Sequence, residues 1–133
     1  MTSLTGIPLA VTLTAANVHD LRQILYLVFA AFPTIGGRPG RPLTRPASVT
    51  ADKGYDCQTT RDLLEAAEIE THIPRRHQED TSPLGQVRWP IERTLSWLKQ
   101  FRRLRIRWDR LTHLHEAFLQ LACSIIAWRH LNI

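Results

Sequence analysis

The sequence predicts an α/β fold in which short strands alternate with helices. β-branched and apolar stretches recur at 7–14, 48–51 and 69–73. Helical spacing of apolar residues fills the segments between and after them, and glycines and prolines separate the segments. Such alternation is typical of a domain in which helices pack on a sheet. The chain of 133 residues is long enough for one domain with a hydrophobic core.

The N-terminal third predicts a strand region, a turn and a helix. Residues 7–14 predict one or two strands, although Pro8 suits a central strand poorly. Residues 15–17 predict a turn, and a helix then extends to about Phe32. Its predicted inward face consists of Leu21, Ile24, Leu25 and Val28.

A segment rich in glycine, proline and arginine, residues 33–48, follows this helix. It predicts a loop whose length is unusual inside a compact domain, which indicates a functional or a mobile segment. A short strand at 48–51 is predicted to end at Asp52, and Lys53 and Gly54 form the turn that leaves it.

The middle of the chain predicts a helix, a strand and a loop. The helix covers about 58–68, with Asp56 or Thr59 as its N-cap. Apolar and polar residues alternate over 69–73, which predicts a strand, and 77–85 is a polar loop. The predicted inward face of the helix consists of Leu63, Leu64 and Ala67.

The C-terminal third predicts two helices. The first begins at Pro90, a residue well suited to the first helical position, and ends near Phe101. Residues 104–108 alternate in a way that favours an extended segment, and the last helix covers about 111–131. The predicted core stripes are Ile91, Leu95 and Leu98 on the first helix, and Leu111, Leu114, Phe118, Leu121, Ile125 and Trp128 on the second.

The composition excludes several classes of protein. We find no secretory signal in the first residues and no membrane span, because charged and polar residues interrupt the apolar stretch at 111–133. Cys57 and Cys123 are far apart and form no CxxC pair. The expectation is therefore a cytoplasmic protein with reduced cysteines.

The net charge of +5 is unevenly distributed. Residues 1–87 hold 8 Lys/Arg and 9 Asp/Glu, whereas residues 88–133 hold 9 Lys/Arg and 3 Asp/Glu. The excess is densest between Arg102 and Arg110. A basic segment fits a polyanion, because neutralised phosphates release counterions. The alternative is a solvated basic face without a partner.

Two acids are candidates for a catalytic metal site. Asp52 lies at the predicted carboxyl end of a strand, where α/β sheets gather ligands, and Glu92 lies in the first predicted turn of a helix. Two-metal phosphodiester chemistry needs carboxylates. Each acid also has an ordinary explanation, since aspartate before a glycine turn and glutamate at a helix start are common.

The run from Trp97 to Arg110 interleaves aromatic residues with cations. Trp97 and Phe101 are expected in the core. Arginine suits phosphate recognition because its planar fork donates two hydrogen bonds. The alternative is that the arginines only keep this surface soluble. The DNA-binding candidates of the run are Lys99, Arg102, Arg103, Arg105 and Arg107.

Four motifs follow one another along the chain. They are GIPLAVTLTAANVHD at 6–20, ADKGYD at 51–56, RWPIERTLSWLKQFRRLRIRWDR at 88–110 and HLHEAFLQLACSIIAWRHL at 113–131. As a set they resemble the C-terminal part of the catalytic domain of insertion-sequence transposases of the DDE class. The resemblance covers nearly the whole chain and implies a single partial domain with an RNase H-like mixed sheet flanked by helices.

The resemblance also implies roles for individual residues. It places the second catalytic aspartate on Asp52 and the catalytic glutamate on Glu92, with Arg88 and Lys99 at the signature spacing around it. It also implies that Arg88 and Lys99 bind DNA, at the phosphate backbone near the cut. The signature tyrosine position holds Gly85. The implied cofactor is Mg²⁺ or Mn²⁺ held by the two acids. The implied partner is double-stranded DNA, with the arginine run on the flanking duplex.

The family's first catalytic aspartate has no counterpart here, because Asp20 falls in a different family motif. We therefore expect a sheet without its first strand and a chain inactive alone, either a remnant or the product of a downstream reading frame. A second copy or an upstream-frame product is a further expected partner, and the expected location is the nucleoid. The alternatives are a non-catalytic DNA-binding protein that occupies transposon ends, and an RNase H-like nuclease unrelated to transposition.

Overall fold

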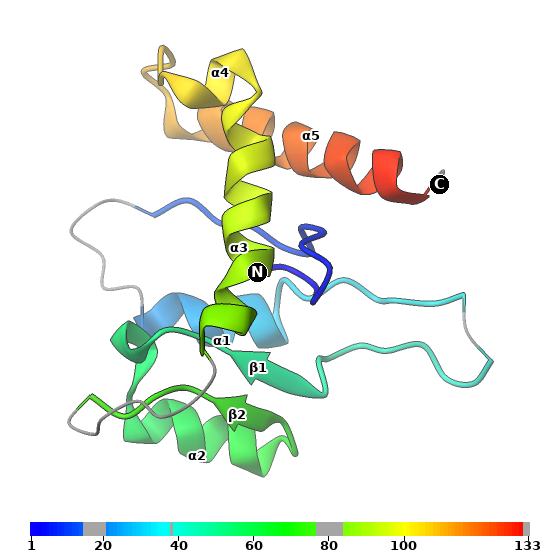
Figure 1. The fold of residues 1–133 in the computed structure, drawn as a ribbon, viewed down its shortest axis with the longest axis vertical. Helices are drawn as coiled ribbons and strands as arrows, with labels where there is room; N and C mark the ends of the chain where they lie inside the picture. The colour runs from blue at the N-terminus through cyan, green and yellow to red at the C-terminus, as the bar shows by residue number, and fades with distance from the viewer. Residues whose placement is uncertain (15–20, 38, 77–83, 132–133) are drawn as a thin grey trace. The chain divides into compact units, whose positions relative to one another are not determined.

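The computed structural model describes residues 1–14, 21–37, 39–76 and 84–131, with only the backbone of Arg22 and of residues 84–88. The chain divides into two compact units. One unit combines Met1–Leu13 with Pro83–Ile133, and the other is Thr14–Ser82. We refer to them as the helical unit and the sheet unit. Figure 1 labels their helices and strands.

The sheet unit contains a parallel two-stranded sheet. Its strands β1 (Ser48–Thr50) and β2 (Glu70–His72) pair in register, with Val49 opposite Thr71. The helix α2 connects them and packs on β2, which makes a β-α-β unit. The remaining elements of this unit are α1 (Leu21–Phe29), the short 3₁₀ helix η1 (Lys53–Tyr55) and α2 (Gln58–Ala66).

One hydrophobic core holds the sheet unit together. The elements α1, β1 and α2 contribute buried side chains to it, as do Ile69 and Ile73 on either side of β2. Half-buried Tyr55 of η1 packs against it. Leu64 of α2 is fully buried. The alternation over 69–73 is confirmed, because the odd positions are inward and Glu70 and His72 are exposed. The buried core residues are Ile24, Val28, Val49, Leu64, Ile69 and Ile73.

The helical unit is built on α3 (Leu84–Lys99), α4 (Arg102–Arg105) and α5 (Thr112–Leu131), which contact one another. The N-terminal segment packs on α3 at a close backbone approach. The hydroxyl of buried Thr94 donates to the carbonyl of Gly6 and lies 2.9 Å from the carbonyl of Pro90. A Cβ on Gly6 would lie 3.0 Å from that carbonyl of Pro90.

The strand expected at 7–14 is wrong. The N-terminal segment turns back on itself instead, with the amide of Ser3 2.9 Å from the carbonyl of Ile7 and an isolated bridge between Thr2 and Pro8. This local pairing uses the backbone groups that a sheet would need, and Pro8 has no amide hydrogen to give. The turn expected at 15–17 lies outside the described residues.

The start of the α3 helix was also predicted wrongly. Pro90 lies in its interior, because the helix begins at Leu84, inside the segment expected to be a polar loop. An interior proline removes one backbone hydrogen bond. Pro90 is buried, and its own carbonyl accepts from the hydroxyl of Thr94, so packing supports the proline in this position.

The buried faces of α3 and α5 differ from the predicted stripes. Ile91 and Leu95 are exposed, and Pro90 and Thr94 are buried instead. On α5 the buried residues are Ala122 and Ile126, while Phe118 and Ile125 are half-buried. Apolar residues surround most of α5, so spacing alone could not identify the inward face. The α5 residues expected inside but found exposed are Leu111, Leu114, Leu121 and Trp128.

Three smaller predictions need correction. Arg102–Arg105 forms a helical turn, and the chain becomes extended only at Ile106. The N-cap of α2 is Cys57, not Asp56 or Thr59. Leu63 is 46% exposed, and Thr60 takes the inward position beside Leu64. The helix α1 is confirmed, with Ile24 and Val28 buried, but it ends at Phe29 and not near Phe32.

The segment 33–48 is a loop up to Ala47, as predicted. Ile35 and Leu43 pair across this loop. The amide of Ile35 donates to the carbonyl of Leu43 at 2.8 Å, and the amide of Leu43 donates to the carbonyl of Ile35 at 2.9 Å. β1 begins at Ser48. Among the described residues, no helix is both long enough and apolar enough to cross a membrane.

Candidate active site

Asp52 follows β1 by two residues and starts the turn that leaves the sheet. Its backbone is extended, and its Oδ1 accepts a hydrogen bond from the amide of Gly54, so it caps η1. A Cβ on Gly54 would lie 3.0 Å from that oxygen, which explains the glycine at this position. The carboxylate is exposed, as a group that meets a ligand must be.

Asp56 and Arg76 fix the turn that begins at Asp52. The amide of Arg76 donates to Oδ2 of Asp56 at 3.0 Å. The guanidinium of Arg76 donates to two carbonyls of η1, from Nη2 to Gly54 at 3.1 Å and from Nε to Lys53 at 3.4 Å. The residues that follow β2 therefore hold the turn that follows β1.

Arg61 completes this network from α2. Its Nε and Nη2 lie 2.9 and 2.8 Å from Oδ1 of Asp56, and Nη2 also donates to the carbonyl of Ile73. The hydrogen bonds from Arg61 and Arg76 lower the pKa of Asp56. Asp56 therefore favours its carboxylate form and helps to fix the turn that carries Asp52.

The sequence predicts Asp56 only as a helix cap and predicts no role for Arg61 or Arg76. The sequence does contain a pattern that indicates the pairing of Asp56 with Arg61. An aspartate just before a helix and an arginine on the first turn of that helix are within reach of each other. The role of Arg76 depends on the pairing of β1 with β2, which no local pattern encodes.

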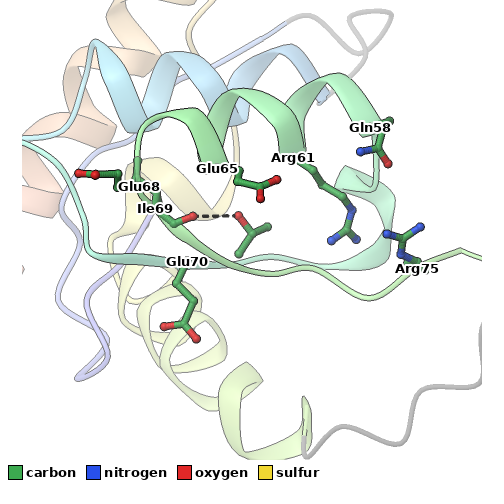
Figure 2. Close-up of a pocket in the computed structure, with 8 residues that line it drawn as sticks. Gln58, Arg61, Glu65, Glu68, Ile69, Glu70 and Arg75 are labelled. Atoms are coloured by element: carbon green, nitrogen blue, oxygen red, sulfur yellow. Dashed lines mark hydrogen bonds between the residues drawn. The ribbon is translucent and has the colours of Figure 1, made fainter.

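A separate pocket of about 500 Å³ lies beside α2 and β2 (Figure 2). Cations and acids share it, and the carboxylates of Glu68 and Glu70 extend away from Arg61. Within it the hydroxyl of Thr71 donates to the carbonyl of Ile69 at 3.2 Å. Asp52 does not line this pocket.

Glu92 lies on the exposed side of α3, together with Ser96 and Lys99. Beside it, the guanidinium carbon of Arg93 lies 4.9 Å from the ring centroid of Trp89 and 4.5 Å from that of Trp97. This stacking fixes the turn of α3 that carries Glu92. The side chain of Arg88 lies outside the described residues.

Asp52 belongs to the sheet unit and Glu92 to the helical unit. The described residues contain no group of three or more potential metal ligands. Asp52 nevertheless suits a hard cation such as Mg²⁺, because it offers an exposed carboxylate oxygen that makes no hydrogen bond to another described residue. Glu92 offers an exposed carboxylate in the same way.

The cations after α3 fall into two groups. Arg103 lies 3.4 Å from Oδ1 of Asp109, and Arg107 donates to the carbonyl of Asp109 and to the hydroxyl of Thr112, each at 3.2 Å. These two arginines hold the chain between α4 and α5. In the described part of the molecule, the exposed cations without an intramolecular hydrogen bond or ion pair include Lys99, Arg102 and Arg105.

Comparison with known proteins gives two matches. Residues 1–127 match the family model described as "Transposase DDE domain". Over 132 residues the chain is 48% identical to the Burkholderia cepacia protein named "Putative transposase for insertion sequence element IS402". The aligned region covers 99% of this chain and 62% of that relative. No solved structure matches.

Proposed function

Because the chain belongs to the transposase DDE domain family, we propose that it supplies part of an active site for phosphodiester hydrolysis and strand transfer on DNA. The observation that carries the proposal is the geometry of Asp52. Its carboxylate is exposed just beyond a strand of a parallel sheet, on a turn that Asp56 and Arg76 fix. Such a position at the carboxyl end of a strand suits ligand binding.

We assign Asp52 and Glu92 as the two carboxylates of this site. The assignment also places β1 and β2 in an RNase H-like sheet, and the parallel pairing of the two strands supports this.

A divalent cation, Mg²⁺ or Mn²⁺, is the cofactor that these acids fit. When bound, it would polarise the scissile phosphate and lower the pKa of the attacking oxygen. Asp52 would hold it with the oxygen that does not cap η1. Arg61 and Arg76 keep the turn in one conformation, so that this oxygen is positioned before the metal arrives.

The exposed cations that follow Glu92 are assigned to the DNA backbone. Lys99, Arg102 and Arg105 are free to contact phosphates, because no described residue pairs with them. The main role of Arg103 and Arg107 would be to hold the chain between α4 and α5 in place. This surface would position a duplex without reading its sequence.

The test for Asp52 is Mn²⁺-induced relaxation of amide NMR signals, which does not depend on activity. We expect bound Mn²⁺ to broaden the Gly54 amide in the wild type and much less in Asp52→Asn, which keeps an oxygen to cap η1. Glu65→Gln removes an exposed acid from α2 and is the matched control. Equal broadening in all three proteins would contradict the assignment of Asp52.

Nicking of supercoiled plasmid in Mn²⁺ tests the chemistry. We expect the chain to bind the plasmid at low salt without nicking it. Nicking that is lost in both Asp52→Ala and Glu92→Ala would show that two acids suffice. Nicking retained in both variants would contradict the assignment of Asp52 and Glu92 to the active site.

A second candidate function is DNA binding without catalysis, in which the chain occupies transposon ends. The unpaired cations at Lys99, Arg102 and Arg105 favour it. It predicts salt-dependent DNA binding that is unchanged by Asp52→Asn and Glu92→Gln, together with no Mn²⁺ effect at Gly54.

A further inference from the structure

An exposed tryptophan lies in a cationic hollow of the helical unit. The hollow has a volume of about 390 Å³, and the described residues that line it are Arg102, Arg103 and Trp108. Trp108 is 72% exposed. Trp108 thus offers a large aromatic face to solvent in a hollow that two arginines also line.

One side of the hollow is held in place. Arg103 lies 3.4 Å from Oδ1 of Asp109, and its guanidinium carbon lies 5.0 Å from the ring centroid of Phe118. The side chain of Arg103 remains 59% exposed despite these contacts, whereas that of Asp109 is only 11% exposed. The anchoring carboxylate is thus largely covered, and the positive side chain is the one that meets solvent.

The other two side chains are available to a ligand. Within the described residues, Arg102 forms no hydrogen bond or ion pair and Trp108 makes no ring contact. The described residues that line the hollow include no acid. The hollow therefore favours a planar aromatic ligand that carries negative charge.

We propose that this hollow binds an unpaired base of single-stranded DNA. Trp108 stacks on the face of the base, and Arg102 and Arg103 contact the phosphates on either side. Stacking tolerates every base, because each has a π face. A base inside a duplex has both faces covered by its neighbours, so Trp108 selects an unpaired nucleotide. The proposal rests on the DNA-binding part of the proposed function and adds to it a preference for unpaired ends.

The test compares three fluorescein-labelled DNAs by anisotropy with the full chain. One is a blunt duplex, one carries a short unpaired thymidine tail, and one carries a tail of abasic sites with the same phosphates. We expect the wild type to bind the thymidine tail roughly ten-fold more tightly than the abasic tail. The abasic tail removes the stacking partner and leaves the charge unchanged.

Three variants locate the effect. Trp108→Ala should lose the preference for the thymidine tail, and Trp108→Phe should keep most of it, because a ring remains. Trp128→Ala is the matched control, since Trp128 is also exposed, at 68%, and lies on α5. Its preference should equal that of the wild type. Thermal unfolding of each variant checks that the fold is intact.

The outcomes separate this proposal from the proposed function. Binding of blunt duplex without any preference for the thymidine tail overturns the base pocket and leaves the DNA surface standing. An equal loss on all three DNAs in Trp108→Ala also overturns it, because the ring would then serve duplex binding or folding. Failure of the wild type to bind any of the three DNAs would reject both proposals.

Discussion

The guanidinium of Arg61 donates two hydrogen bonds to the same carboxylate oxygen of Asp56, from Nε at 2.9 Å and from Nη2 at 2.8 Å. The two side chains are 17% and 18% exposed, so the pair is shielded from most of the solvent. The second oxygen of Asp56 accepts from the amide of Arg76. One carboxylate thus ties α2 and the segment after β2 to the turn that carries Asp52.

This network gives a prediction for acid stability. The pKa of Asp56 is lowered from its ordinary value of 3.8, mainly by the hydrogen bond from Arg61. Its contribution is therefore complete above the ordinary pKa and is lost as pH falls through the lowered one. Urea unfolding between about pH 7 and about pH 2 should show a steeper acid loss in the wild type than in Asp56→Asn. Asp62→Asn, an exposed acid of α2, should follow the wild type.

The core of the sheet unit predicts opposite results for two adjacent leucines. Leu64 is fully buried, so Leu64→Ala should lower the free energy of unfolding by about 2–5 kcal/mol. Leu63 is 46% exposed, and Leu63→Ala should cost less than about 1 kcal/mol. Chemical denaturation of both variants measures the difference. Equal costs would mean that α2 presents another face to the core.

The contact between the N-terminal segment and α3 predicts a large effect at Gly6. Its φ is +82°, and a Cβ there would meet the carbonyl of Pro90 at 3.0 Å. Gly6→Ala should therefore lower stability by roughly 1–3 kcal/mol or more. Gly37→Ala is the matched control, because its φ is +83° with nothing within 4 Å of the added Cβ. Comparing their melting temperatures isolates the cost of the contact.

The two groups of arginines predict different salt dependence. Arg105→Ala should lower the slope of log K against log salt by about 0.9, as expected for one lost phosphate contact, without changing stability. Arg107→Ala removes the bonds to Asp109 and Thr112, so it should lower the melting temperature. DNA titrations at several salt concentrations, with melting curves, test both. If Arg105→Ala and Arg107→Ala changed the salt slope and the melting temperature equally, the division into phosphate-binding and structural arginines would be wrong.

The sequence by itself determined the family, the order of β1, β2 and the helices α1, α2, α3 and α5, and the candidate acids. ADKGYD places Asp52 at a strand end, and the alternation over 69–73 identifies β2, because period-two patterns appear directly in the chain. The sequence also shows that the excess of Lys and Arg over Asp and Glu lies in residues 88–133. These properties depend on residue type and spacing, which are local.

Tertiary structure alone decided which faces and partners those residues use. Pro90 lies inside α3 because Thr94 and Gly6 pack around it, although its local preference is for a helix start. α5 is apolar around most of its surface, so the segments that pack against it determine that Ala122 and Ile126 are buried. Arg76 reaches η1 because β2 pairs with β1. Each of these contacts joins segments distant in sequence, and no local pattern carries that information.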